Sequence, residues 1–335
     1  MKYTISDIAE VAQVSKATVS RVINNKSQGV SAQTKERILK IINDIGYLPN
    51  TLARSMVLSK TKTLGLIIPD ITNPFFPQMV RGIVHYANEC GYTVFLCNAD
   101  NDPKEEEKYV MSLIEKRVDG VILASSAEEG SSSLSSLKHY DVPVVQVDRI
   151  IEGNDAAHSV SVDNQSGFYC ATKVFTERHH QNIAFLGGPK GVSTTAQRLS
   201  GYQSALEDAG LPFRKDLVYF GEYSIQSGID MTEQMLSSGL PFTAIVGGCD
   251  LIAIGAVKAL RKVGVAVPNS CEVIGFDGIE LGEIFDPALS TVAQPIAEMA
   301  EEAAKLLIGI INGTIVSKRH IMIGPSLVLR ETTMP

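Results

Sequence analysis

Two carboxylates, two arginines, two side-chain amides and three aromatic rings stand where they could form one ligand site. Most of them directly follow short apolar runs of the kind that form buried strands, and one lies in the helix-like stretch TTAQRLSGY; the set is Asn73, Phe75, Phe76, Asp148, Arg149, Arg198, Tyr223, Asp277 and Gln294. Carboxylates accept pairs of hydroxyl protons, and arginine donates a fork of hydrogen bonds to oxygen atoms. Aromatic faces cover C–H surface. Such a set suits a small neutral polyol.

Each of these residues also has a simpler interpretation. Asp148 and Arg149 could pair at the surface of a loop, and Asp277 begins an Asp-Gly turn signal. Phe75 and Phe76 could belong to a core. Taken together, at matching strand ends, the residues favour a binding site. The two carboxylates could in principle serve glycoside hydrolysis, but the chain has no serine-hydrolase, phosphate-loop, zinc-protease or dinucleotide motif in the right context, so we expect no enzyme activity and no cofactor.

The elements that must position these residues are short apolar strands that alternate with stretches of helical length. The strand-like runs are LGLIIPD (64–70), TVFLCNAD (93–100), DGVILAS (119–125), PVVQVDR (143–149), SVSVD (159–163), NIAFLGG (182–188), LVYFGEY (217–223), AIVGGCD (244–250), EVIGFDG (272–278) and STVAQP (290–295). Continuous apolar strands separated by helices are typical of buried parallel sheets, and the series is long enough for two. We therefore predict an α/β body with two lobes, which binds its ligand at the carboxyl ends of the strands.

The first 60 residues differ from the rest of the chain in charge. They hold nine Lys or Arg and four Asp or Glu, a net charge of +5, whereas the remainder holds 21 and 33, a net charge of −12. A basic head on an acidic body indicates a module that binds a polyanion, joined to a unit with a different role.

The basic head has the pattern of three short helices. Apolar residues recur at helical spacing in three stretches: Ile5, Ile8, Ala9 and Ala12; Val19, Val22 and Ile23; and Ile38, Ile41, Ile42 and Ile45. Ser15 and Ser31 are good N-caps for the second and third helices, and Gly46 ends the third. Three short helices with a tight turn between the first two are typical of a helix-turn-helix unit.

The second of these helices, over 15–24, has a polar face that could enter the major groove of DNA. This face consists of Lys16, Ala17, Ser20, Arg21 and Asn24. The groove admits short side chains with a few long donors: arginine pairs with guanine, and serine and threonine reach phosphates or base edges. By spacing alone the face could equally be a solvated surface. The positive charge of the head favours DNA, because neutralisation of phosphates dominates DNA affinity.

Composition restricts the class of the protein. Apolar residues make up 44% of the chain and charged residues 20%, an ordinary globular composition. No apolar run approaches the roughly 20 residues that a membrane span needs, and the first residues lack the apolar core of a secretory signal, so we expect a cytoplasmic protein. Five widely spaced cysteines without a C-x-x-C pair, and the adjacent His179 and His180, predict neither a disulfide framework nor a metal site.

The head closely resembles the N-terminal signature of the lactose/galactose repressor family of bacterial regulators. The resemblance rests on ISDIAEVAQVSKATVSRVINN and VSAQTKERILKIINDIGYLPNTLARSM, and it extends over the whole chain. It implies that Lys16, Ala17 and Arg21 read the operator, and that 50–60 is a hinge helix which orders on DNA. Met56 stands where the family usually wedges a leucine into a base step of the minor groove. The DNA-binding residues expected in this way are Thr4, Ser15, Lys16, Ala17, Thr18, Ser20, Arg21, Asn24, Asn50, Ala53, Arg54 and Met56.

The body resembles the periplasmic sugar-binding proteins whose fold this family shares, most closely their ribose-binding branch and the ribose-operon repressors. The resemblance implies that eight of the nine residues named first, all except Tyr223, bind a sugar. Cys249, in the stretch GGCD, stands where that branch usually has an asparagine, and we include it in the effector site. Loss of one amide from the site could indicate a modified or different pentose. We expect Asp250 to cap the helix that follows.

The predicted domains are a helix-turn-helix domain over 1–49, a hinge over 50–61, and an effector-binding and dimerisation domain over 62–335. Within the last, we expect an N-lobe over about 62–161 and 291–320 and a C-lobe over about 162–290 and 321–332. By resemblance, the dimer surface combines the helix near 77–89 with residues near 280–286.

The sequence therefore predicts a homodimeric repressor of a sugar-catabolism operon, which leaves a palindromic DNA operator when ribose or a related pentose closes its lobes. One alternative reverses the sign: a small molecule or a phosphocarrier protein acts as corepressor and strengthens DNA binding. Another alternative, an extracytoplasmic component of sugar transport, is disfavoured by the head and by the absence of a signal. We expect no membrane partner.

Overall fold

The computed structural model describes residues 3–24, 28–47, 60–126, 132–151, 158–314 and 320–334. The chain forms two compact units, Met1–Thr61 and Lys62–Pro335, called the head and the body below. The residues predicted for the hinge (Asn50, Ala53, Arg54 and Met56) lie outside the described residues.

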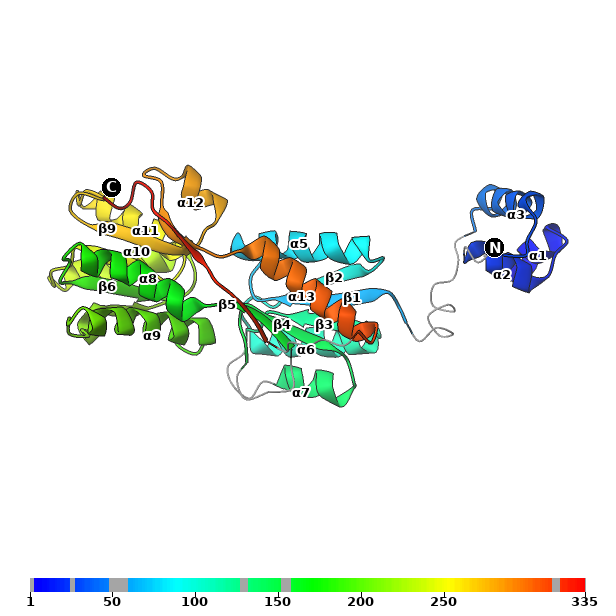
Figure 1. Cartoon of the computed structure of the whole chain (residues 1–335), viewed down its shortest axis with the longest axis horizontal. Helices are drawn as coiled ribbons and strands as arrows, with labels where there is room; N and C mark the ends of the chain where they lie inside the picture. The colour runs from blue at the N-terminus through cyan, green and yellow to red at the C-terminus, as the bar shows by residue number, and fades with distance from the viewer. Residues whose placement is uncertain are drawn as a thin grey trace. The chain divides into compact units, whose positions relative to one another are not determined.

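The described part of the head consists of the helices α1 (Ile5–Val11), α2 (Lys16–Ile23) and α3 (Ala32–Asp44) (Figure 1). Each helix begins at a hydroxyl side chain that accepts a hydrogen bond from the backbone N–H three residues later, and these caps are Thr4, Ser15 and Ser31. Their apolar stripes meet in one core, formed by Ile8, Ala9, Ala12, Val19, Val22 and Ile38. The predicted helix-turn-helix fold is confirmed.

The N-lobe of the body is built on a parallel sheet with the strand order β11-β5-β4-β3-β1-β2. Its strands are β1 (Thr63–Ile68), β2 (Thr93–Asn98), β3 (Gly120–Leu123), β4 (Val144–Val147), β5 (His158–Val162) and β11 (His320–Ile323). Its helices are α5 (Phe75–Glu89), α6 (Pro103–Glu115), α7 (Ser132–His139) and α13 (Ile296–Ile311). Helix α13 packs against α5 and the central strands, as Figure 1 shows.

The C-lobe repeats this plan with the strand order β12-β10-β9-β8-β6-β7. Its strands are β6 (Ile183–Gly187), β7 (Val218–Phe220), β8 (Ala244–Gly247), β9 (Glu272–Asp277), β10 (Ser290–Ala293) and β12 (Ser326–Val328). Its helices are α8 (Asn164–Glu177), α9 (Ser193–Asp208), the 3-10 turn η1 (Lys215–Leu217), α10 (Ile225–Ser237), α11 (Asp250–Lys262) and α12 (Glu280–Ile284). The prediction of two parallel sheets is confirmed, with one difference: the edge strand β12 runs antiparallel to β10.

The chain crosses between the lobes after β5, after β10 and after β11. The approximate lobe limits predicted at 290/291 and 320/321 fall a few residues before these crossings. Strand β10 pairs with β9 of the C-lobe through Ala293, and β11 pairs with β5 of the N-lobe through Ile323. Buried strands of the two sheets have the same apolar pattern, so the sequence does not show which sheet a strand joins.

Glycines allow the helices of the C-lobe to pack closely. A Cβ at Gly201 of α9 would collide with the backbone carbonyl of Gln165 in α8. Between α10 and α11 the same holds for Gly228 against the carbonyl of Ile252. Close backbone approach fixes the helices of each pair against one another.

None of the described helices is long and apolar enough to span a bilayer. The longest of them, α9 and α13, have 16 residues each. In the same part of the chain, no group of three or more His, Cys, Asp or Glu side chains is placed to hold a metal ion.

Candidate functional site

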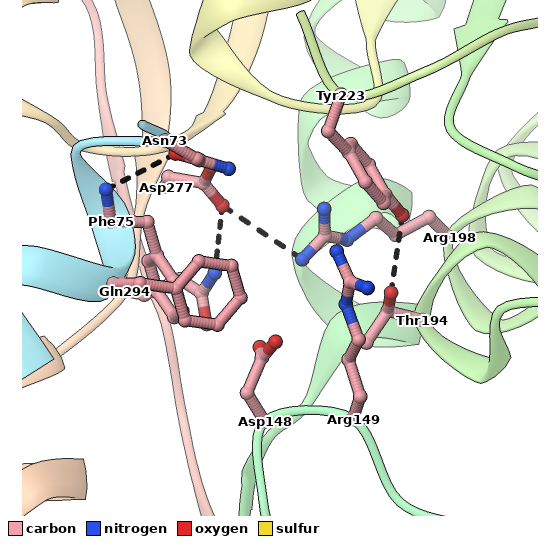
Figure 2. A pocket seen from close by; sticks show the side chains of 10 residues that line it. Asn73, Phe75, Asp148, Arg149, Thr194, Arg198, Tyr223, Asp277 and Gln294 are labelled. Carbon is pink, nitrogen blue, oxygen red and sulfur yellow. Dashed lines mark hydrogen bonds and ion pairs between the residues drawn. The ribbon is translucent and has the colours of Figure 1, made fainter. Parts of the chain in front are cut away.

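A small cavity in the body is lined by side chains from both lobes (Figure 2). The N-lobe contributes Asn73, Phe75, Phe76, Asp148 and Arg149, and the C-lobe contributes Thr194, Arg198, Tyr223, Asp277 and Gln294. Nine of these were predicted from the sequence, and Thr194 was not. The structure thus brings together residues that are spread over more than 200 positions of the chain.

The apolar wall of the cavity is formed at the start of α5. Asn73 follows β1, and its Oδ1 accepts a hydrogen bond from the backbone N–H of Phe75 at 3.1 Å. This bond turns the chain into the helix and directs the next two rings to the cavity. The rings of Phe75 and Phe76 pack edge to face, with centroids 5.1 Å apart.

Asp148 directly follows β4 and has a positive φ of 63°. Its side chain is buried, and its Oδ1 has no hydrogen-bond partner among the described residues. Burial raises the pKa of the Asp148 carboxyl, and the positive charges of Arg149 and Arg198 oppose this rise. A buried acceptor without a partner is costly, so this oxygen is suited to accept a donor from a ligand.

Arg149 is held between a polar anchor and two aromatic rings. Its Nη1 donates to Asn101 Oδ1 at 3.0 Å. Its guanidinium carbon lies 5.6 Å from the ring centroid of Phe76 and 5.4 Å from that of Tyr223. Stacking on rings orients the planar guanidinium without neutralising it.

Arg198 is one turn into α9 and is fixed by three contacts. Its Nε donates to Asn164 Oδ1 at 2.8 Å, and its Nη1 donates to the carbonyl of Gly248. Its guanidinium carbon lies 4.0 Å from the ring centroid of Phe276. The remaining nitrogen, Nη2, lies 3.9 Å from Asp277 Oδ1, the ion pair drawn in Figure 2.

Asp277 is the last residue of β9 and has a positive φ of 117°. Its Oδ1 accepts a hydrogen bond from Gln294 Nε2 at 2.8 Å, whereas Gln294 Oε1 has no partner among the described residues. Burial raises the pKa of Asp277 to about 8; Arg198 opposes the rise, and the charge of Asp250 adds to it.

Tyr223 closes one side of the cavity with its ring and anchors its hydroxyl on α9. The hydroxyl lies 3.1 Å from the hydroxyl of Thr194 and 2.7 Å from that of Thr195. Thr194 lies one helical turn before Arg198, on the same face of α9. That i, i+4 spacing is the signal by which the sequence could have indicated it.

Two expectations about the stretch 249–250 are corrected. Cys249 does not line the cavity: it is the N-cap residue of α11 and is buried, which raises the pKa of its thiol. Asp250 does not cap α11. Its carboxylate instead accepts hydrogen bonds from the backbone N–H groups of Gly278 and Ile279 and from the hydroxyl of Thr291.

The cavity is equipped to bind a polyol. Asp148 Oδ1 and Gln294 Oε1 are acceptors that need donors, and the two guanidinium groups are donors aimed between them. The aromatic wall is of a kind that covers the C–H surface of a ligand.

In the head, the residues predicted to contact DNA fall into two groups. Lys16, Ala17 and Arg21 of α2 are exposed. The others make bonds within the helices: Thr4 and Ser15 are N-caps, Thr18 donates its N–H to Ser15 Oγ, and Asn24 Nδ2 donates to the carbonyl of Ser20. The first group is therefore available for base contacts, and the second shapes the helix that presents them.

Comparison with known protein families agrees with both units. Residues 61–330 match the family described as periplasmic binding proteins and sugar binding domain of LacI family, and residues 4–50 match bacterial regulatory proteins, lacI family. The chain belongs to the LacI family. The predicted resemblance to lactose/galactose repressors is confirmed.

Curated LacI-family relatives match the chain over nearly all of its length. The HTH-type transcriptional regulator DegA of Bacillus subtilis is 35% identical, over 100% of this chain and 99% of the relative. The ribose operon repressor of Halalkalibacterium halodurans is 36% identical, over 98% and 97%. Catabolite control protein A of Priestia megaterium is 34% identical, over 99% and 100%.

Solved structures give the same result. The lac repressor dimer bound to operator and the anti-inducer ONPF is 25% identical, with a TM-score of 0.90 over 100% of both chains. A LacI family regulator from Enterococcus faecium with bound ribose is 29% identical, with a TM-score of 0.73 over 82% of this chain and 99% of that chain. This LacI-family protein is a DNA-binding transcription regulator, and the relatives are regulators rather than enzymes.

Proposed function

We propose that this LacI-family regulator binds ribose or a closely related pentose in the cavity of its body, and that binding releases the head from a palindromic operator of a sugar-catabolism operon. One observation carries the proposal: Asp148 Oδ1 and Gln294 Oε1, buried acceptors that have no partner among the described residues, lie in one small cavity with two guanidinium donors. A polyhydroxylated ligand supplies hydrogen-bond donors to these two oxygens and acceptors to the two guanidinium groups.

Two relatives support ribose in particular. One is named a ribose operon repressor, and the other was solved with bound ribose. Both resemble this chain across the body that contains the cavity.

We propose a homodimer whose surface includes α5, α12 and the edge strand β2. Strand β2 ends the N-lobe sheet and exposes Phe95 and Leu96, at 42% and 44% of their surface. Ile284 of α12 is 74% exposed. Exposed apolar side chains on an open sheet edge are typical of an interface. A two-fold dimer presents two heads to the two halves of a palindrome.

Ligand and DNA then oppose each other through the arrangement of the lobes. The ligand contacts side chains of both lobes, so it favours the conformation in which they meet around it. A ligand can shift the equilibrium between two conformations only by the difference in its affinity for them. The factor by which the effector weakens DNA binding must equal the factor by which bound DNA weakens effector binding.

The test is a titration of the full-length protein with ribose, other pentoses, hexoses, cellobiose and purines by calorimetry. We expect saturable binding of ribose or one related pentose, and no binding by Asp277→Ala, whereas the exposed Asp141→Ala control binds as wild type does. The same sugar must then lower affinity for a duplex selected from a random library. A rise in operator affinity would assign the protein to corepression, and absence of binding by every sugar would favour a phosphocarrier protein as effector.

A further inference from the structure

Asp250 is a buried carboxylate that lies close to the effector cavity but does not line it. It is the first residue of α11, its side chain is fully buried, and it makes no cap bond with its own helix. Its two oxygens instead receive three hydrogen bonds from β10 and from the turn after β9.

The first pair of bonds fixes the turn that carries Asp277. Asp250 Oδ2 accepts from the backbone N–H groups of Gly278 and Ile279, both at 2.8 Å. Asp277 and Gly278 both have positive φ, 117° and 77°. Such a backbone persists only where neighbouring groups hold it, and here the neighbouring group is a carboxylate that binds the two N–H groups directly after Asp277.

The third bond connects Asp250 to the strand that carries Gln294. Asp250 Oδ1 accepts from the hydroxyl of Thr291 in β10 at 2.6 Å. Three residues later, Gln294 Nε2 donates to Asp277 Oδ1 at 2.8 Å. Asp250 therefore fixes the Asp277 carboxyl group in two ways. It holds the turn that follows Asp277, and it holds the strand that leads to Gln294, whose amide binds the Asp277 carboxyl group.

Glycine at 275 and 278 makes room for this arrangement. A Cβ at Gly275 would collide with Asp250 Oδ1, and a Cβ at Gly278 would lie 2.7 Å from the Cβ of Ala293. The close approach of α11, β9 and β10 at this point thus depends on residues without side chains.

We propose that Asp250 is a positioning residue of the effector site: it holds the Asp277 carboxyl group in place for the ligand and sets a second acidic group beside it. The inference rests on the proposed binding of ribose in this cavity. Asp250 touches no ligand and acts through Asp277 and Gln294.

The charges around the pair indicate the direction of the effect. Burial raises the pKa of Asp250 to about 7 despite its three hydrogen bonds and the nearby Arg330. Asp277 faces Arg198 of α9, Asp148 after β4, and Cys249 and Asp250 of the 249–250 stretch. Among these, Asp250 raises the pKa of Asp277 and Arg198 lowers it, so an uncharged residue at 250 lets Asp277 ionise at lower pH.

The experiment compares four variants of the full-length protein. Asp250→Asn keeps oxygen for the turn but removes the charge, Asp250→Ala removes both, and Thr291→Val removes only the link to β10. Glu272→Gln is the control, because Glu272 is also a buried carboxylate of the C-lobe but lies at the other end of β9, where it binds Arg178 and His180. Circular dichroism establishes that each variant is folded.

The first readout needs no ligand. In protein labelled with ¹³C at the aspartate carboxyl carbons, the Asp277 signal is assigned by its loss in Asp277→Asn and followed as a function of pH. We expect its midpoint to fall by half a pH unit or more in Asp250→Asn and to stay unchanged in Glu272→Gln. An unchanged midpoint in Asp250→Asn contradicts the proposal.

The second readout is ribose affinity between pH 5.5 and 9. We expect at least a tenfold loss in Asp250→Ala, a smaller loss in Asp250→Asn with its pH profile shifted downward, and an intermediate loss in Thr291→Val. If Asp250→Ala is unfolded, the other two variants decide. Wild-type ribose affinity and a wild-type pH profile in both Asp250→Asn and Thr291→Val would overturn the proposal. Failure of the wild-type protein to bind ribose would instead contradict the proposed function, and the carboxyl titration would then be the test of Asp250.

Discussion

Asp148 and Asp277 occupy the same place in the two sheets of the body. Each lies at the carboxyl end of the third strand in its sheet, β4 in the order β11-β5-β4-β3-β1-β2 and β9 in the order β12-β10-β9-β8-β6-β7. Both have positive φ, 63° and 117°, and both are buried. The two lobes thus offer one carboxylate each to the same cavity. The contribution of each carboxylate to ligand affinity can therefore be measured by substituting one at a time.

Asp148→Asn tests the N-lobe carboxylate. Because Asp148 Oδ1 has no partner among the described residues, we expect a ligand hydroxyl to donate to it. Hydrogen bonds to charged groups contribute about 1.5–3 kcal/mol, so the variant should bind ribose roughly ten- to a hundredfold more weakly in calorimetry. Asp141→Asn is the matched control, since Asp141 is exposed and also has positive φ, 54°. Equal affinities of the two variants would argue against a ligand contact at Asp148.

The pH dependence of stability follows from the raised pKa of Asp277. Between the unfolded value of about 4 and the folded value of about 8, the folded state keeps a proton that the unfolded chain has released. The free energy of unfolding therefore falls as pH rises through this window, by at most about 1.4 kcal/mol per pH unit for the group. The measurement is calorimetric melting of the body without ligand. The free energy of unfolding of Asp277→Asn, relative to that of the wild-type protein, should increase from pH 5 to pH 8. A constant difference across that range would contradict the assignment.

Effector affinity should change with pH in the opposite direction. An ionised Asp277 accepts hydroxyl donors more strongly than the protonated acid does. We therefore expect ribose affinity to rise as pH increases through about 8 and then to level off. In Asp277→Asn the residual affinity should be flat over the same range, as measured by titration in buffers of equal ionic strength.

Arg21→Ala tests the helix proposed to read DNA. Arg21 is exposed near the end of α2, and a bidentate contact of arginine with guanine contributes about 1–3 kcal/mol of discrimination. Binding to the selected duplex should weaken and become indifferent to one base pair in each half-site. Arg37→Ala removes the same charge from the exposed surface of α3, and we expect it to change only the salt dependence. Loss of discrimination in both variants would show that α2 alone does not read the bases.

Ile284→Glu tests the proposed dimer surface. A buried, unpaired carboxylate at an interface is strongly unfavourable, so sedimentation should show dissociation at concentrations where the wild-type protein is a dimer. Met322→Glu is the control. Met322 lies on β11, at the opposite edge of the N-lobe sheet from β2, and is 67% exposed against 74% for Ile284. Dissociation by Met322→Glu alone would move the interface to that edge.

Much of the site could be predicted because its residues follow strands. Asn73, Asp148 and Asp277 are marked by an apolar run that ends, and in parallel sheets such ends converge on one edge. Thr194 was missed because it belongs to a helix and has no such mark. The helical period places Thr194 on the same face of α9 as Arg198. Whether that face lines the cavity depends on how α9 packs against the rest of the lobe.

The errors have the same origin. An aspartate at the start of a helix usually caps it, yet Asp250 instead reaches the turn after β9, since Gly275 leaves space for its carboxylate there. Cys249 was included in the site by resemblance to a motif. Its side chain is buried beside the cavity rather than in its lining.

By itself, the sequence determined the local structure and its chemistry: the three capped helices of the head, the series of buried strands, the separation of charge between head and body, and the polar residues at strand ends. These features depend on periodicity, turns and caps, which act over a few residues. Only the tertiary structure decided which sheet β10 and β11 join, that Thr194 faces Arg198's cavity, and that Asp250 holds Asp277. Such contacts join residues far apart in the chain, and their geometry is fixed by the close packing of helices against sheets rather than by any local pattern.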